Sequence, residues 1–266
     1  MNLVFLGAGK MATAIAAGVV DKGILATGDI WACDINPEAR AQFTARTGVA
    51  CGEFDPAVFA NADAILLAVK PQTAAAALAA LPPLKPACLV VSIMAGVPLA
   101  RLAGWLGTER IVRTMPNTPL MVGCGATGFA CGAGVSAADA DFVRRVFGAL
   151  GFVGEVPEES LNAVTALSGS GPAYVFEFVQ ALVNAGTAVG LSPELALGLT
   201  VQTVAGAAAM LSQKLGTPDE LRKAVTSPGG TTAAGLAVLE EAKFRDLMRR
   251  VVLAARDRGV ELGRSS

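Results

Sequence analysis

Short, continuous runs of hydrophobic residues alternate with helical segments through the first half of the chain. The clearest runs cover residues 3–6, 29–33, 63–69, 88–93 and 110–114, and a shorter one covers residues 49–51. Such runs are typical of strands that are covered on both faces of a parallel sheet. Helical segments lie between them: residues 38–46, the alanine-rich stretch after residue 72, and a helix capped by Ser136. We therefore predict an α/β domain with a Rossmann-like, doubly wound sheet over residues 1–157.

Two further segments complete this first domain. Residues 125–130 are expected to form an antiparallel strand at the edge of the sheet, and residues 152–156 to return to the sheet after the Ser136 helix. The strand pattern stops after Pro157, and hydrophobic residues then recur at helical spacing to the end of the chain. Residues 158–266 are therefore predicted to be an all-helical second domain.

The turn after the first strand has the spacing of a dinucleotide-binding loop. Gly7 allows a tight turn, Gly9 leaves room for a pyrophosphate, and Ala12 lets the following helix lie close to the strand. The N–H groups at the start of that helix then face the phosphates. The motif is weak alone, but here it follows a strand and precedes a helix. We therefore predict cofactor contacts at Gly7, Ala8, Gly9, Lys10 and Met11.

Cofactor preference depends on the end of the second strand. Asp34 lies about 20 residues after the glycines, where an acid binds the ribose and favours NAD over NADP. Asn36 and the helix that it caps offer a place for a 2′-phosphate instead. A third interpretation is that both side chains only shape the turn. The residues alone leave the preference open.

Ligands of a doubly wound sheet bind at the carboxyl ends of its strands. Residues that follow two of the predicted strands are therefore expected to line the cofactor cleft: Ala68, Val69, Lys70 and Pro71, and then the small-residue segment 92–98. Lys70 is either a phosphate or carboxamide contact or a solvated loop lysine. Residues 115–119, with two prolines around Asn117 and Thr118, form a rigid turn whose role is either structural or functional.

Composition narrows the chemistry. A net charge of −1 without basic runs makes nucleic acid an unexpected partner. The chain has no histidine, which removes the commonest acid–base group and the commonest metal ligand, so no metal site is predicted. Its five cysteines include no C-x-x-C pair and fit buried positions in a reducing cytoplasm. Hydrophobic residues make up 53% of the chain, which suits an apolar oligomer interface, but no apolar run approaches the roughly 18–20 residues that span a membrane.

A second informative loop lies between two predicted helices at residues 226–232. Its Pro-Gly-Gly sequence exposes backbone N–H groups, and Thr231 and Thr232 add hydroxyl donors at the next helix start. These groups form a carboxylate receptor that needs no histidine, lysine or arginine. The alternative is a plain connection between helices with a threonine cap.

Six segments in order resemble the pyrroline-5-carboxylate reductase family along nearly the whole chain. They are residues 7–12, 68–72, 92–97, 113–119, 167–174 and 226–232, of which the last is similar to the family signature. The resemblance implies an NAD(P)H-dependent reductase that makes L-proline from 1-pyrroline-5-carboxylate, the last step of proline synthesis. It also implies a helical domain that intertwines with a second copy, giving homodimers or rings of dimers.

The resemblance also implies site residues. Cofactor contacts are expected at residues 7–12, Asn36, residues 68–71, Met94 and Ala95. Substrate contacts are expected at Ser170, Ser227, Pro228, Gly229, Gly230, Thr231 and Thr232. Thr232 matches the threonine beside the imine nitrogen and is the predicted catalytic residue. Many members carry an uncharged residue at the position of Asp34; NADPH is still the expected cofactor, and NADH remains possible.

Two rivals differ in what they require of the sequence. A related β-hydroxyacid dehydrogenase needs a lysine base one helical turn beyond the glycine-rich segment, where this chain has Val175. A cofactor-sensing protein without turnover has no use for a carboxylate-binding loop at residues 226–232. A related imine reductase is the third alternative, and the residues do not separate it from the family assignment.

Overall fold

The computed structural model describes residues 1–265 and divides into two compact units. Unit 1 holds residues 1–170 and the chain from Ala254 onward, and unit 2 is Gly171–Leu253. The predicted domain boundary at residues 157/158 was drawn from the change of element type rather than from contacts, and it stays a prediction. Each unit is described by itself.

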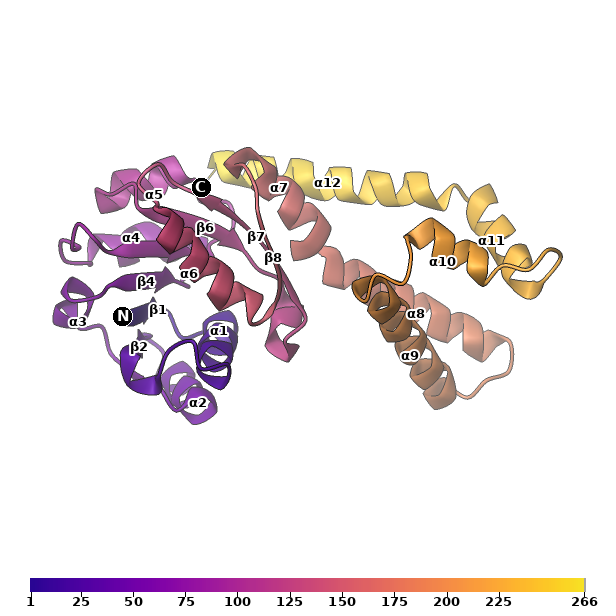
Figure 1. The fold of residues 1–266 in the computed structure, drawn as a ribbon, viewed down its shortest axis with the longest axis horizontal. Coiled ribbons are helices and arrows are strands. Elements are labelled where there is room, and N and C mark those ends of the chain that lie inside the picture. The colour runs from indigo at the N-terminus through magenta and orange to yellow at the C-terminus, as the bar shows by residue number, and fades with distance from the viewer. Residues whose placement is uncertain (266) are drawn as a thin grey trace. The chain divides into compact units, whose positions relative to one another are not determined.

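Unit 1 contains one sheet, with strands in the order β3-β2-β1-β4-β5-β6-β7-β8 among the described residues (Figure 1). Only the β6–β7 pair is antiparallel among these neighbours. The strands are β1 (Leu3–Leu6), β2 (Ile30–Cys33), β3 (Ala50–Gly52), β4 (Ala64–Leu67), β5 (Leu89–Ser92), β6 (Ile111–Met115), β7 (Gly125–Cys131) and β8 (Gly151–Glu155). Every residue of β1, β4 and β5 is buried, as expected from their continuous apolar sequences. The predicted Rossmann-like, doubly wound α/β fold is confirmed.

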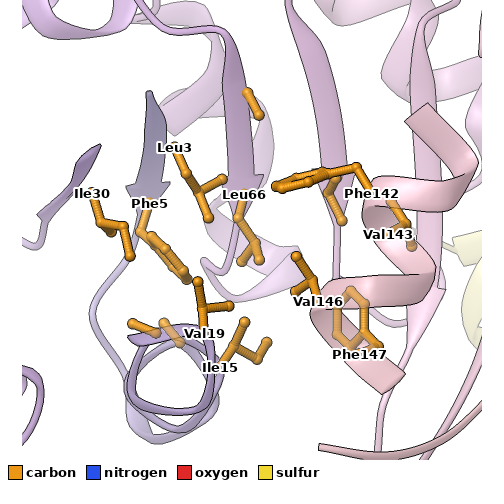
Figure 2. Packing of buried hydrophobic residues seen from close by; sticks show 14 of the residues in the cluster. Leu3, Phe5, Ile15, Val19, Ile30, Leu66, Phe142, Val143, Val146 and Phe147 are labelled. Carbon is orange, nitrogen blue, oxygen red and sulfur yellow. The ribbon is translucent and has the colours of Figure 1, made fainter. Parts of the chain in front are cut away.

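Helices cover both faces of this sheet. One face carries α1 (Lys10–Asp21), α2 (Pro37–Thr47) and α6 (Ala137–Gly148), and the other carries α3 (Pro56–Ala60), α4 (Ala74–Ala79) and α5 (Leu99–Leu106). Figure 2 shows the first layer, where Phe5 of β1 and Leu66 of β4 face Ile15 of α1 and Val146 of α6. This packing fixes the start of α1 at the end of β1, which is where the site is built.

Short turns of 3₁₀ or π geometry connect several of these elements. The 3₁₀ turns are η1 (Thr27–Asp29), η2 (Pro71–Thr73), η3 (Thr118–Val122) and η4 (Glu158–Ser160). After η4, the short helix α7 (Leu161–Val164) continues directly into the π-helical turn η5 (Thr165–Gly169). The predicted glycine-rich break therefore begins as a widened helical turn.

The expected edge strand lies inside the sheet. β7 is antiparallel to β6, as predicted, but β8 pairs with its other side and forms the edge. The reason is the connection: α6 crosses over between β7 and β8, and a helical crossover places the two strands parallel to each other.

Unit 2 is built from helices alone among its described residues. It contains α8 (Gly171–Ala188), α9 (Pro193–Ser212), α10 (Pro218–Ala224), α11 (Thr231–Glu241) and the first part of α12 (Phe244–Ser265). Ser192 caps α9 by accepting a hydrogen bond from the Leu195 N–H. Thr217 and Glu220 form a reciprocal capping box at the start of α10. The predicted all-helical region is thus confirmed.

Most apolar side chains of unit 2 are exposed or only partly buried. Within Gly171–Leu253, Ala196 is the one residue whose side chain is buried. α9 is long and apolar enough to cross a membrane by length and composition, with a mean hydropathy of 1.6 and 11% of that window buried. No unbroken apolar run in α9 reaches this length; the helix qualifies through its overall composition, with polar residues scattered among the apolar ones. A helix face of this kind equally suits an interface between protein chains.

Candidate active site

The glycine loop lies where the strand order of the sheet reverses. β1 has β2 on one side and β4 on the other, and the loop follows the carboxyl end of β1. The Gly7 N–H donates to the Cys33 carbonyl oxygen (2.8 Å), and the Ala68 N–H donates to the Leu6 carbonyl oxygen (2.9 Å). These bonds tie the loop to both neighbouring strands at the topological switch point, the usual ligand site of such sheets.

Three small residues in this loop have the geometry that their predicted roles require. Gly7 has φ +104°, and a Cβ there would lie 2.8 Å from the Ala68 carbonyl oxygen. Gly9 is the N-cap of α1, and a Cβ there would meet nothing within 4 Å, so its outer side is open. Ala12 is buried against the sheet. The first-turn N–H groups of α1 have no side-chain cap and remain available to a phosphate.

Asp34 makes a contact that the sequence did not reveal. One carboxylate oxygen, Oδ2, accepts a hydrogen bond from the Ala8 N–H (2.8 Å), and the other, Oδ1, accepts from the Asn36 N–H (2.9 Å). Asp34 therefore ties the glycine loop to the segment after β2. Asn36 caps α2, as expected, by accepting from the Glu38 N–H (2.8 Å). The turn-shaping interpretation thus holds in part, since both side chains are engaged with backbone N–H groups.

We expect Asp34→Ser to raise the ratio of kcat/KM with NADPH to kcat/KM with NADH. Asp34 is predicted to lie beside the cofactor ribose, so removing its carboxylate should remove repulsion of a 2′-phosphate, and an effect of about tenfold corresponds to one such charge in a partly solvated site. Steady-state rates with both reduced cofactors give the ratio.

Asp34→Asn is the matched control, because it removes the charge but keeps a side-chain oxygen that can accept from the Ala8 N–H. Both variants should raise the ratio of kcat/KM with NADPH to kcat/KM with NADH. In Asp34→Ser, loss of the hydrogen bond from the Ala8 N–H should also weaken the binding of both cofactors equally, which leaves the ratio unaffected. An unchanged ratio in both variants would show that Asp34 acts only on loop geometry.

The other strand ends have mixed exposure. After β4, Ala68, Val69 and Pro71 are half-buried, whereas Lys70 is exposed. After β5, the Met94 side chain is only 2% exposed and packs in the hydrophobic cluster beneath α3, α4 and α5. Its N–H donates to the Ser92 Oγ (3.2 Å). Met94 can therefore reach a cofactor only through its backbone, while Ala95 is exposed.

Cysteine chemistry is absent from this region. Burial raises the pKa of the Cys33 thiol, next to the glycine loop, to about 11, and it raises the pKa of Cys51 on the neighbouring strand to about 11. Both thiols stay protonated near neutral pH and are poor nucleophiles. The five cysteines are free, and Cys33 and Cys88 are buried as expected, although Cys124 is exposed. The described residues contain no cluster of three or more candidate metal-ligating side chains.

The predicted carboxylate receptor lies in unit 2, at the start of α11. Gly230 is the N-cap of this helix and provides no side-chain cap, so Thr231 and Thr232 lie in its first turn with exposed side chains. The Gly230 N–H turns back to the Ser227 carbonyl oxygen (3.1 Å). The threonine-cap alternative is therefore wrong. Backbone N–H groups and hydroxyls of one short segment are left for a small anion.

Ser170 lies in unit 1, immediately after the π-helical turn. Its side chain is half-buried, and its N–H donates to the Thr165 carbonyl oxygen (2.8 Å), five residues back. Single π turns inside helices are frequent at functional sites. The sequence showed only a glycine-rich break here, because i→i+5 hydrogen bonding has no simple residue pattern.

Two family models match the chain. One, described as pyrroline-5-carboxylate reductase dimerisation, matches residues 158–262. The other, described as NADP oxidoreductase coenzyme F420-dependent, matches residues 2–96.

Full-length relatives cover both matched segments. A pyrroline-5-carboxylate reductase of Pseudomonas aeruginosa is 42% identical over 264 residues, which cover 98% of this chain and 96% of the relative. The solved structure of a pyrroline-5-carboxylate reductase from Coxiella burnetii is similar, with a TM-score of 0.91, 35% identity and 98% of both chains covered. A Plasmodium falciparum pyrroline carboxylate reductase with NADP bound has a TM-score of 0.87 and 31% identity, covering 99% of this chain and 98% of that chain.

Proposed function

The chain belongs to the pyrroline-5-carboxylate reductase family, and we propose from this premise how its residues divide the reaction. The protein reduces 1-pyrroline-5-carboxylate to L-proline, the last step of proline biosynthesis, as an NAD(P)H-dependent oxidoreductase that acts on a CH–NH group. Membership of this family excludes the β-hydroxyacid dehydrogenase alternative, which the absence of a lysine at Val175 had already weakened.

The reaction suits a site without histidine. The cyclic imine reacts as its protonated iminium, whose C=N carbon accepts a hydride while the nitrogen keeps its proton, so the product amine needs no strong acid. When bound, the reduced nicotinamide supplies that hydride. The protein has to hold the ring in line, fix its carboxylate and exclude water; orientation of this kind supplies about 7–11 kcal/mol of the barrier.

For the cofactor, we assign the glycine loop and the neighbouring strand ends. Support comes from the open face of Gly9, the uncapped N–H groups of α1 and the position of the loop at the reversal of strand order. The proposed contacts are Gly7, Ala8, Gly9, Lys10, Met11, Asp34, Asn36, Ala68, Val69, Lys70, Pro71, Met94 and Ala95. Within this set, Met94 acts through its backbone and Asp34 acts partly through Ala8.

For the substrate, we assign contacts at the start of α11 in unit 2 and, separately, at Ser170 in unit 1. The observation that carries this assignment is the α11 N-terminus, where no side chain caps the first turn and both threonines are exposed. The positive end of the helix dipole and free N–H groups favour a carboxylate there. The proposed contacts are Ser170, Ser227, Pro228, Gly229, Gly230, Thr231 and Thr232, with Thr232 beside the ring nitrogen as the catalytic residue.

The test compares two substrates that differ only in the carboxylate. We expect kcat/KM for 1-pyrroline, which lacks it, to be lower than for 1-pyrroline-5-carboxylate by about 10- to 100-fold, as for the loss of hydrogen bonds to a charged group. The KM for NADPH should be the same with both. Equal kcat/KM values would overturn the carboxylate receptor at residues 227–232 without affecting the cofactor assignment.

We also propose that the protein acts as a homodimer, with a ring of dimers as the larger assembly, in the cytoplasm and without membrane or nucleic-acid partners. Unit 2 has almost no buried side chains of its own, and residues 158–262 match a dimerisation model. A second copy would bury the exposed apolar faces of α8 and α9, which include Phe176, Phe178, Leu195 and Leu199. A net charge of −1 without basic runs in the sequence does not favour nucleic acid as a partner.

A further inference from the structure

Asn117 joins two distant parts of unit 1 through its side chain. The amide nitrogen Nδ2 donates a hydrogen bond to the Ser168 carbonyl oxygen (3.0 Å), and the amide oxygen Oδ1 accepts one from the Ala126 N–H (2.8 Å). Asn117 is only 8% exposed. Since both ends of a buried amide are used, the side chain has one orientation that satisfies its partners.

The Ser168 carbonyl oxygen lacks the hydrogen-bond donor that it would have in a regular α-helix. In a continuing α-helix it would accept from the N–H four residues later, but that residue is Pro172, which has no N–H. The chain widens into the π turn here, and the Ser170 N–H bonds back to Thr165 instead. The Asn117 amide therefore supplies the donor that the proline removes.

The π turn also packs closely against the strands next to Asn117. A Cβ on Gly169 would lie 2.8 Å from Cε of Met115, two residues before Asn117, so the turn seats closely on the end of β6. A Cβ on Gly128 of β7 would lie 2.8 Å from Cγ1 of Val164, just before the turn. The π turn is thus pressed against β6 and β7, and the Asn117 bond fixes its register along them.

We propose that Asn117 is a positioning residue for the substrate: by holding the Ser168 carbonyl, it sets the place of Ser170, the proposed substrate contact in this turn. The inference rests on the assignment of Ser170 to the substrate under the proposed function. Asn117 is not required to touch the substrate; it acts through the backbone two residues before Ser170.

Asn117→Asp tests the donor alone. It keeps an oxygen that accepts from the Ala126 N–H, but it removes the N–H donor and turns a negative oxygen towards the Ser168 carbonyl. We expect the KM for 1-pyrroline-5-carboxylate to rise by about tenfold, with the KM for NADPH within about twofold of wild type since the glycine loop is untouched. The ratio of variant to wild-type KM should fall as the pH is lowered from about 8 to about 6, because a protonated carboxyl regains a donor.

Ser168→Ala is the matched control. It removes only the hydroxyl bond to the Val164 carbonyl oxygen (3.0 Å) and leaves the Ser168 carbonyl in place, so its substrate KM should equal that of wild type. Gly128→Ala is the second variant, used also if Asn117→Asp does not fold. Its Cβ would lie 2.8 Å from Cγ1 and 2.9 Å from Cγ2 of Val164, a stiff branched side chain just before the turn, so the same KM should rise with Asn117 intact.

Ser170→Ala separates this inference from the assignment on which it depends. If Ser170→Ala raises the substrate KM while Asn117→Asp and Gly128→Ala leave it unchanged, the positioning role is overturned and the substrate assignment stands. If Ser170→Ala leaves the KM unchanged, both the assignment of Ser170 and the role of Asn117 are overturned. A KM defect in Asn117→Asp that is independent of pH and equal for NADPH would show a merely structural residue.

Discussion

Thr232→Ala is expected to lower kcat by about 10- to 100-fold while the dissociation constant for NADPH stays at its wild-type value. Thr232 lies in the first turn of α11 with an exposed side chain. Its proposed partner is the ring nitrogen of the substrate, whose position must be held within a fraction of an ångström for hydride transfer. A threonine hydroxyl is too weak an acid to act alone, so the loss is one of orientation and proton relay.

Two conservative variants isolate the hydroxyl. Thr232→Val keeps the branched shape and should show the same loss of kcat as Thr232→Ala, whereas Thr232→Ser keeps the hydroxyl and should recover most of the rate. Single-turnover kinetics measure the hydride step, and fluorescence titration measures cofactor binding. A large loss of NADPH affinity in Thr232→Val would place the hydroxyl on the cofactor instead.

Features whose physical cause lies within a few residues along the chain could be predicted from the sequence. The buried strands follow from continuous apolar runs, and the glycine loop follows from a fixed spacing between a strand and a helix. Asn36 marked the start of α2, as Ser136 marked the start of α6. In each case the physical cause lies within a few residues, so the pattern carries the information.

Features that join distant residues were not readable. The bond from the Ala8 N–H to Asp34 spans 26 positions, and the bond from Asn117 to Ser168 spans 51. Each hydrogen bond depends on which strands become neighbours in the sheet, and local sequence patterns do not show that pairing. The edge position of β8 was not predicted for the same reason, since the hydrophobic pattern shows that a strand exists but not which strand lies beside it.

The loop at residues 226–232 was predicted from the sequence only in part. Its residue types indicated a carboxylate receptor, but a capped helix start explained them equally well until Gly230 proved to be the N-cap. Local geometry excludes the threonine cap, because the threonine hydroxyls are not used to cap α11, and the carboxylate receptor stays a prediction. The roles of the individual residues rest on the family resemblance and remain predictions that the substrate comparison and the Thr232 variants address.

Substitution of the two loop glycines by alanine separates folding from cofactor binding. Gly7→Ala places a methyl group 2.8 Å from the Ala68 carbonyl oxygen and 2.9 Å from its carbon, at a backbone with φ +104°. Neither atom can retreat without opening the β1–β4 pairing. We expect a loss of about 2–4 kcal/mol in the free energy of unfolding, from backbone strain and steric overlap together, and a matching loss of cofactor binding. Urea unfolding monitored by circular dichroism measures the first quantity.

Gly9→Ala is the counterpart, since its φ of −69° suits any residue and its Cβ would meet no protein atom within 4 Å. The free energy of unfolding should stay within about 0.5 kcal/mol of wild type. The dissociation constant for NADPH should nevertheless rise by about 100-fold, because the new methyl group stands where the pyrophosphate approaches the backbone. Wild-type NADPH affinity in a folded Gly9→Ala protein would mean that the pyrophosphate does not pass over Gly9. The glycine loop would then be a structural turn, and the cofactor assignment would have to move to the ends of β4 and β5.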